Sequence, residues 1–175
     1  ENQLGEVTVD LRLGYDFLIP VLTRKPMIGL IQEDAGFRSI ASYYQSTRRQ
    51  VGERFLLYPN QTVLSTTLEY IALPNDIYAD IFTRSSYSRL GINFNAMIQP
   101  GFRGCFPLEL SNTSNNPIEL IVGSRIIQSR FTSVNSSNGY HSQVERRKYF
   151  GNIRPTVSQA PADKDLETLN KIASA

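Results

Sequence analysis

Cysteine and histidine are almost absent from this chain of 175 residues. Cys105 is its only cysteine, His141 is its only histidine, and it contains no tryptophan. This scarcity excludes an internal disulfide and a zinc site built from Cys and His ligands. A Cys-His catalytic dyad would require these two residues to pair. The functional groups that remain available for catalysis or binding are carboxylates, hydroxyls, guanidinium groups and backbone N–H groups.

An excess of one charge and long apolar runs are lacking as well. The chain has 18 Lys and Arg against 16 Asp and Glu, a formal charge of +2. This balance argues against general binding to nucleic acid or to a membrane surface. No apolar run approaches the roughly 18 residues that span a bilayer, and no basic-then-apolar leader is present. We therefore expect a soluble, cytoplasmic protein that binds neither nucleic acid nor a membrane.

Short β-prone runs separated by turn residues dominate the first 132 residues. They are residues 7–13, 54–58, 62–73, 77–83, 92–98, 105–110, 118–122 and 125–131. Gly, Pro or Asn bounds these runs, which predicts an antiparallel all-β fold, either a barrel or a compact sandwich. In the run 105–110, strand alternation places Phe106, Leu108 and Leu110 on the core face and Glu109 on the opposite face.

Two segments depart from this pattern. Residues 33–50 lack a clean strand period, which predicts a short helix or an irregular excursion. Residues 133–175 are first polar and then basic, so we expect a flexible tail outside the core. This tail ends either in a short helix with Leu166, Leu169 and Ile172 on one face or in a frayed terminus. The predicted organisation is one domain, with a β-barrel over residues 1–132 and a lid or tail over 133–175.

The densest polar cluster is the segment of residues 83–91. Arg84 and Arg89 flank a run of serines that includes Ser85 and Ser86. Guanidinium groups donate forked hydrogen bonds and hydroxyls add further donors, so this composition suits a phosphate or oxyanion cradle. A solvated polar turn would have the same composition.

Glu109 is the second candidate, because it is a lone carboxylate between Leu108 and Leu110. It lies either on the solvent face or in a pocket, where burial would raise its pKa and allow it to transfer protons. Gln128 could hydrogen-bond a ligand, although an ordinary surface position is the favoured interpretation for a single Gln. Lys148 and Tyr149 with Asn152 are a further candidate group, for which the alternative is a charged surface tail.

Five motifs in order resemble the dCTP deaminase branch of the dUTPase-like superfamily, over about residues 7–165. They are residues 9–14, 67–74, 83–91, 100–104 with 108–112, and 127–128. The tail from Lys148 to Asp165 resembles the deaminase lid rather than the Gly-rich tail of dUTPases. The resemblance implies a distorted β-barrel of short antiparallel and mixed strands with minor helices. It also implies a homotrimer with sites between subunits and a deoxynucleoside triphosphate substrate that carries Mg²⁺, without zinc.

The same resemblance implies roles for individual residues. Glu109 matches the general acid and base, while Ser85 and Arg89 match the residues that orient the attacking water and stabilise charge. The implied nucleotide and phosphate contacts are Arg84, Ser86, Gln99, Gln128, Tyr140, Lys148 and Asn152. The implied reaction is hydrolytic deamination of dCTP to dUTP and ammonia.

Three departures from the family pattern leave alternatives open. Gln99 replaces an Asp that contacts the sugar and, in dUTPases, activates water; an amide can hydrogen-bond but cannot act as a base. Residues 91–99 are shorter than the deaminase hairpin whose backbone reads the pyrimidine edge, and Arg154 replaces a Gly in the tail. The alternatives are a trimeric nucleotide-binding paralogue without catalysis and, less favoured, a dUTP diphosphatase.

Overall fold

The computed structural model of this chain describes residues 3–24, 27–31, 40–135, 140, 143 and 147–173. The strands are β1 (Val9–Arg12), β2 (Asp16–Pro20), β3 (Tyr44–Arg48), β4 (Arg54–Leu57), β5 (Thr62–Ala72), β6 (Ile77–Thr83), β7 (Ile92–Asn93), β8 (Asn95–Ile98), β9 (Arg103–Asn112), β10 (Ile118–Ile121) and β11 (Arg125–Ser133). The helical segments are η1 (Ile40–Tyr43), α1 (Ser85–Ser88), η4 (Ala160–Ala162) and α2 (Lys164–Ala173). The predicted all-β class is confirmed.

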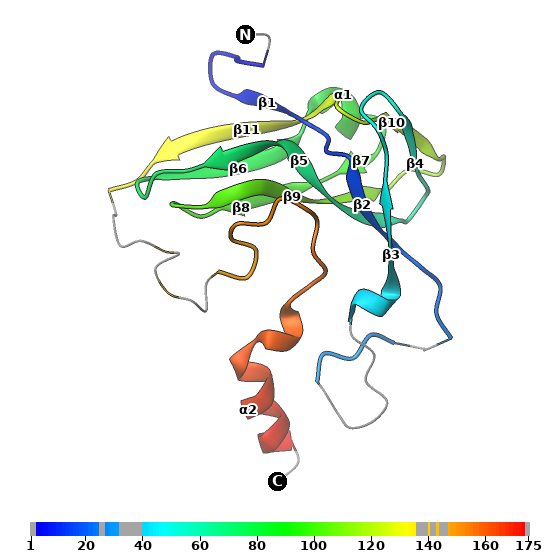
Figure 1. The fold of residues 1–175 in the computed structure, drawn as a ribbon, viewed down its shortest axis with the longest axis vertical. Coiled ribbons are helices and arrows are strands. Elements are labelled where there is room, and N and C mark those ends of the chain that lie inside the picture. The colour runs from blue at the N-terminus through cyan, green and yellow to red at the C-terminus, as the bar shows by residue number, and fades with distance from the viewer. Residues whose placement is uncertain are drawn as a thin grey trace.

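The described strands form three hydrogen-bonded sheets rather than one continuous closed barrel (Figure 1). One sheet has the order β1-β11-β6-β8, the second has the order β3-β2-β5-β9-β7, and β10 pairs with β4 in the third. All strand pairs are antiparallel. Each predicted run overlaps at least one strand of these sheets.

One predicted run differs from a single strand. Residues 92–98 divide at Phe94, which is buried in the core, into β7 and β8. The two halves then pair with different sheets, β7 with β9 and β8 with β6. A continuous strand here is therefore wrong, because the inward turn of Phe94 carries the chain from one sheet to the other.

The prediction missed β2 and β3. In the segment 33–50, residues 33–39 lie outside the described residues, and the remainder contains η1 followed by β3. Among the described residues of this segment, the expected short helix or irregular excursion corresponds to this 3-10 turn. β3 is a strand because it pairs along its whole length with β2, which in turn pairs with β5.

A single core is shared by the three sheets. Leu11, Phe17 and Phe55 come from different sheets and all belong to it, and the rings of Phe17 and Phe55 stack at 4.1 Å. In β9, Phe106 is buried and Glu109 lies on the opposite face, as the alternation predicts. Burial of one face of each strand holds the sheets together.

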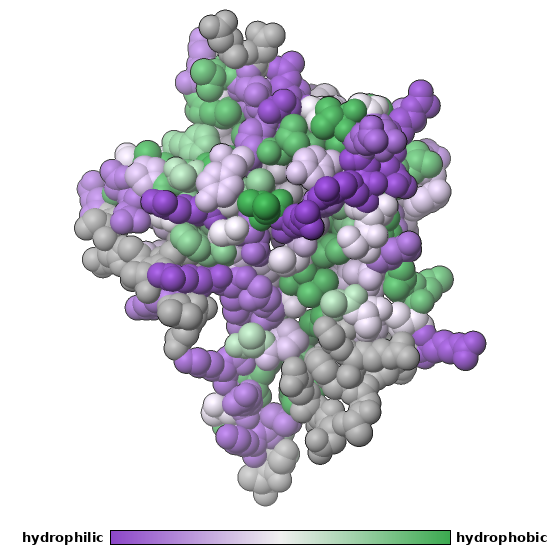
Figure 2. Space-filling view, viewed as in Figure 1, coloured by the Kyte–Doolittle hydropathy of each residue, from purple (hydrophilic) through white to green (hydrophobic). Residues whose placement is uncertain are grey.

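The tail lies outside this core. No described residue beyond Ser129 is buried, and α2 projects away from the strands with mostly hydrophilic side chains on the face shown (Figures 1 and 2). Of the two alternatives for the end of the tail, the structure has the short helix, with Leu169 and Ile172 exposed on it. Among the described residues, neither α1 nor α2 is long and apolar enough to cross a membrane.

Candidate active site

The turn between β6 and β7 carries the predicted Ser/Arg cluster. After β6, the Arg84 N–H donates to the Ile126 carbonyl oxygen at 2.9 Å, which holds the start of the turn against β11. The next residues form α1, on which Ser85 and Ser86 are exposed, and Arg89 follows, also exposed. The structure therefore brings the four predicted residues together on one solvent-facing turn.

Arg84 also lines a cleft of about 770 Å³ together with Arg12 and Arg125, which we call the arginine cleft. Asp10 lies against it, with its carboxylate 3.4 Å from Arg84 Nε and 4.0 Å from Arg125 Nη1. Arg12 Nε lies 2.7 Å from a Glu69 oxygen. Three guanidinium groups thus face two carboxylates, and the remaining positive charge suits an anionic ligand.

Gln128 lies beside this cleft. It sits on β11 directly opposite Asp10 on β1, and its Nε2 donates to the Thr8 hydroxyl at 3.4 Å. Since Asp10 is the carboxylate that contacts Arg84, the fold places both predicted phosphate residues, Gln128 and Arg84, next to the same acidic group.

Glu109 lines a different and smaller cavity of about 210 Å³. One wall comes from the strands, including Leu64, which is paired with Glu109 across β5 and β9, and Ser65. Although Glu109 is exposed along one side, burial of its carboxyl raises its pKa, and a hydrogen bond with its own backbone opposes part of that rise. A carboxyl with this shift can hold and release a proton nearer to neutral pH.

The other wall of the Glu109 cavity is the tail. Tyr149, Pro155, Thr156 and Ser158 line it, so a segment 40 to 49 residues later in the chain lies beside Glu109. The resemblance to the deaminase family predicted that the tail acts as a lid, but the sequence did not indicate which of its residues lie beside Glu109.

Backbone hydrogen bonds attach the tail to the start of β9. The Gly151 N–H donates to the Arg103 carbonyl oxygen at 2.7 Å, and the Cys105 N–H donates to the Asn152 carbonyl oxygen at 2.9 Å. The tail thus pairs with the start of β9 through two backbone hydrogen bonds, as a short neighbouring strand would. Asn152, one of the predicted phosphate contacts from the tail, accepts one of these two hydrogen bonds.

The other predicted binding residues lie outside the arginine cleft lining. Lys148 forms an ion pair with Asp163, Tyr140 is half-buried, and Gln99 is half-buried in the turn between β8 and β9. Glu109 and Arg84 line separate cavities of the single chain. Among the described residues, no group of three or more His, Cys, Asp or Glu could hold a metal ion.

Sequence reasoning also missed three charged residues of the arginine cleft, Asp10, Arg12 and Arg125. Asp10 and Arg12 stand two apart on β1, and Arg125 pairs with Arg12 at the start of β11. Residues two apart on a strand share a face, so the period of β1 was an available signal. The partner strand, however, comes from more than a hundred residues away.

Comparison with solved structures defines the fold class. The chain is similar to the crystal structure of 2'-deoxycytidine 5'-triphosphate deaminase from Agrobacterium tumefaciens, with a TM-score of 0.56 and 26% identity. The match covers 74% of this chain and 40% of that longer chain. The strands described above therefore form an all-β fold of the dUTPase-like class.

Sequence comparison then defines the family. A family model described as dCTP deaminase-like matches residues 1–134. A dUMP-forming dCTP deaminase of Methanobrevibacter smithii is 33% identical over 95% of this chain and 87% of its own length. A dCTP deaminase of Haloarcula marismortui is 35% identical over 94% of this chain and 84% of its own. The chain belongs to the dCTP deaminase-like family.

Proposed function

We propose that this chain deaminates dCTP hydrolytically to dUTP and ammonia. Family membership and the names of the relatives support this substrate. The observation that carries the proposal is Glu109, whose carboxyl has a raised pKa and faces a cavity of about 210 Å³. That volume is below the ~300–1,000 Å³ of pockets that enclose drug-sized ligands, so it suits a single ring rather than a whole nucleotide.

Glu109 acts as general base and general acid in this reaction. It takes one proton from water as the oxygen attacks C4 of the cytosine and passes this proton to N3. It then takes the second proton from the C4 hydroxyl and passes it to the departing amine. The C4–N bond breaks and ammonia leaves, with no zinc required. Ser85 and Arg89 orient the water and offset the charge that develops on the ring.

The arginine cleft receives the phosphates. Arg84 and Ser86 supply guanidinium and hydroxyl donors, and Gln128 lies next to the cleft. Asp10 is already held by two arginines, so we propose that Mg²⁺ arrives on the triphosphate rather than on a protein carboxylate. The remaining proposed contacts are Gln99 toward the sugar and Tyr140, Lys148 and Asn152 from the tail.

A complete site requires a second copy of the chain. Glu109 lies in one cavity while Arg84, next to Ser85, lies in another. We therefore propose a homotrimer in which Glu109 of one subunit meets Ser85 and Arg89 of the next. Mixing Glu109→Gln chains with Ser85→Ala chains should restore activity in about a quarter of the sites. A mixture as inactive as each variant alone would contradict a shared site.

The role of Glu109 is tested by Glu109→Gln. The amide keeps the shape but cannot exchange protons, so we expect ammonia release from dCTP to fall by about 10²–10⁴-fold. Calorimetric titration should show that dCTP still binds. Glu119→Gln, on the exposed face of β10, is the matched control. Near wild-type turnover in Glu109→Gln would sink this mechanism, and dCTP binding without turnover in the wild-type chain would favour the non-catalytic alternative.

The product distinguishes a dUTP-forming deamination from a dUMP-forming one, as in the name of the M. smithii relative. Because Gln99 cannot act as a base, we propose that the triphosphate stays intact. Phosphorus NMR of the product should then show dUTP without pyrophosphate. Release of pyrophosphate from dUTP would show that another group activates water.

A further inference from the structure

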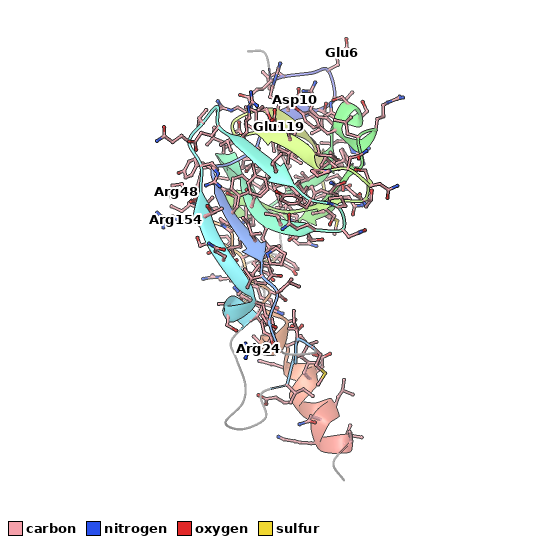
Figure 3. All side chains as sticks on the ribbon, turned by 90° about the vertical axis from the view of Figure 1, so that its right-hand side faces the viewer. Glu6, Asp10, Arg24, Arg48, Glu119 and Arg154 are labelled. Carbon is pink, nitrogen blue, oxygen red and sulfur yellow. The ribbon has the colours of Figure 1, made fainter. Side chains whose placement is uncertain are left out.

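A buried carboxylate joins the tail to β2. Asp16 is bound through both oxygens by Arg48, at 2.7 and 2.8 Å, and Arg48 in turn lies over the Tyr15 ring at 4.8 Å. A second guanidinium group comes from the tail, with Arg154 Nε 3.7 Å from Asp16 Oδ2. Figure 3 shows Arg48 and Arg154 together at one side of the molecule, away from Asp10.

Asp16 does not require Arg154 as a partner for its charge or its hydrogen bonds. The bidentate contact with Arg48 already neutralises the carboxylate and satisfies both of its oxygens. Arg154 is largely exposed and lies beyond hydrogen-bond distance, so its contact is a weak ion pair that salt screens. We therefore expect the ion pair to affect the position of the tail rather than the stability of β2.

The position of Arg154 links the two walls of the Glu109 cavity. Arg154 directly precedes Pro155, the first residue of the covering segment that runs to Ser158. On the strand side, the Ser65 hydroxyl donates to the Asp16 carbonyl oxygen at 2.9 Å, and Ser65 lines the same cavity. Asp16 is thus attached to one wall through its carbonyl and to the other through its carboxylate.

We propose that Arg154 is a positioning residue: its ion pair with Asp16 favours docking of the tail beside Glu109 and so limits the access of water to the side of that carboxyl that lines the cavity. Its effect on catalysis rests on the proposed function, whereas its effect on the tail does not. The titratable groups that face Glu109 are Tyr44 on β3 and Tyr149 on the tail, and the cavity lining among the described residues adds no other charged group. With no other charged group in this lining, water access is the route by which we expect Arg154 to act on Glu109.

The test compares Arg154→Ala, Arg154→Lys and a control, Arg130→Ala, in the full chain. Arg130 forms an exposed ion pair with Asp80 at 2.7 Å on the other large sheet, so its loss measures the effect of removing any surface ion pair. Hydrogen exchange at the Cys105 N–H, which is bonded to the tail, reports closure. Given the strength of exposed pairs, Arg154→Ala should speed this exchange about two- to fivefold.

The salt dependence of exchange and the conservative variant Arg154→Lys provide two further tests of the ion pair. Arg154→Lys should restore protection, and raising the salt concentration should speed exchange in the wild type but not in Arg154→Ala. Carboxyl ¹³C NMR should show the pKa of Glu109 falling toward its ordinary value in Arg154→Ala only. The acidic limb of the pH profile of kcat for ammonia release should move in the same direction.

Two results would overturn the proposal. One is unchanged exchange at Cys105 with an unchanged Glu109 pKa in Arg154→Ala, and the other is an equal change in Arg130→Ala. A wild-type chain that releases no ammonia would refute the proposed function alone, because exchange and the Glu109 pKa are measured without turnover.

Discussion

Gly104 allows the tail to approach β9, and replacing it with alanine should release the tail. A Cβ atom at this position would lie 2.7 Å from the Asn152 carbonyl oxygen and 3.2 Å from Cζ of Phe102. Contacts shorter than 3.0 Å essentially never occur for Cβ atoms. Because the obstructing oxygen belongs to the main chain, no change of side-chain rotamer relieves the clash. The tail must therefore move.

The loss of stability in Gly104→Ala has two contributions, backbone strain and the loss of tail docking. Gly104 has a φ of +142°, and holding alanine in such a conformation costs about 1–3 kcal/mol. Leaving β9 removes two backbone hydrogen bonds of about 0.5–1.5 kcal/mol each. It also removes the edge contact between the rings of Phe150 and Phe102, whose centroids are 6.4 Å apart, worth about 0.5–1.5 kcal/mol. The clash cannot cost more than tail docking contributes, since undocking relieves it.

The variant Gly52→Ala isolates the contribution of backbone strain. Gly52 also has a positive φ, +90°, but nothing lies within 4 Å of the position that a Cβ atom would take, so this variant reports backbone strain alone. We expect Gly52→Ala to lower the free energy of urea unfolding by about 1–3 kcal/mol, the cost of backbone strain. Gly104→Ala should lower it further, by up to the contribution of tail docking, about 1.5–4.5 kcal/mol. Only Gly104→Ala should speed hydrogen exchange at Cys105 and Gly151. Full protection of these amides in Gly104→Ala would refute the account of tail docking.

Two further predictions concern stability. Burial raises the pKa of Glu109, so the native chain binds more protons than the unfolded chain between the ordinary and the raised pKa, and stability falls as pH rises through that window. In urea titrations Glu109→Gln should thus be more stable than wild type at pH 7 and equal to it below the ordinary pKa; equality at both pH values would contradict this. Asn112 is buried and its amide donates to the carbonyl oxygens of Leu57 and Asn116 at 2.9 and 2.8 Å. Asn112→Ala should therefore lower the free energy of unfolding by about 2–4 kcal/mol, and a loss below about 1 kcal/mol would argue against these bonds.

Local pattern was sufficient for much of the fold and part of the site. In β9 the alternation of Phe106, Leu108 and Leu110 with Glu109 predicted which face is buried, because strand geometry repeats every two residues whatever the partner strand. The Ser/Arg turn was equally predictable, since Ser85 and Arg89 are four residues apart and a single short turn places both at the surface.

Tertiary structure alone decided which remote segments meet. β2 and β3 contain Asp16, Pro20 and a run of polar residues, and they are strands because each pairs with the other and β2 with β5. The Glu109 cavity closes only when a tail some forty residues later lies against β9. Periodicity specifies the face on which a side chain lies, whereas pairing across the chain depends on the packing and hydrogen bonding of the whole fold.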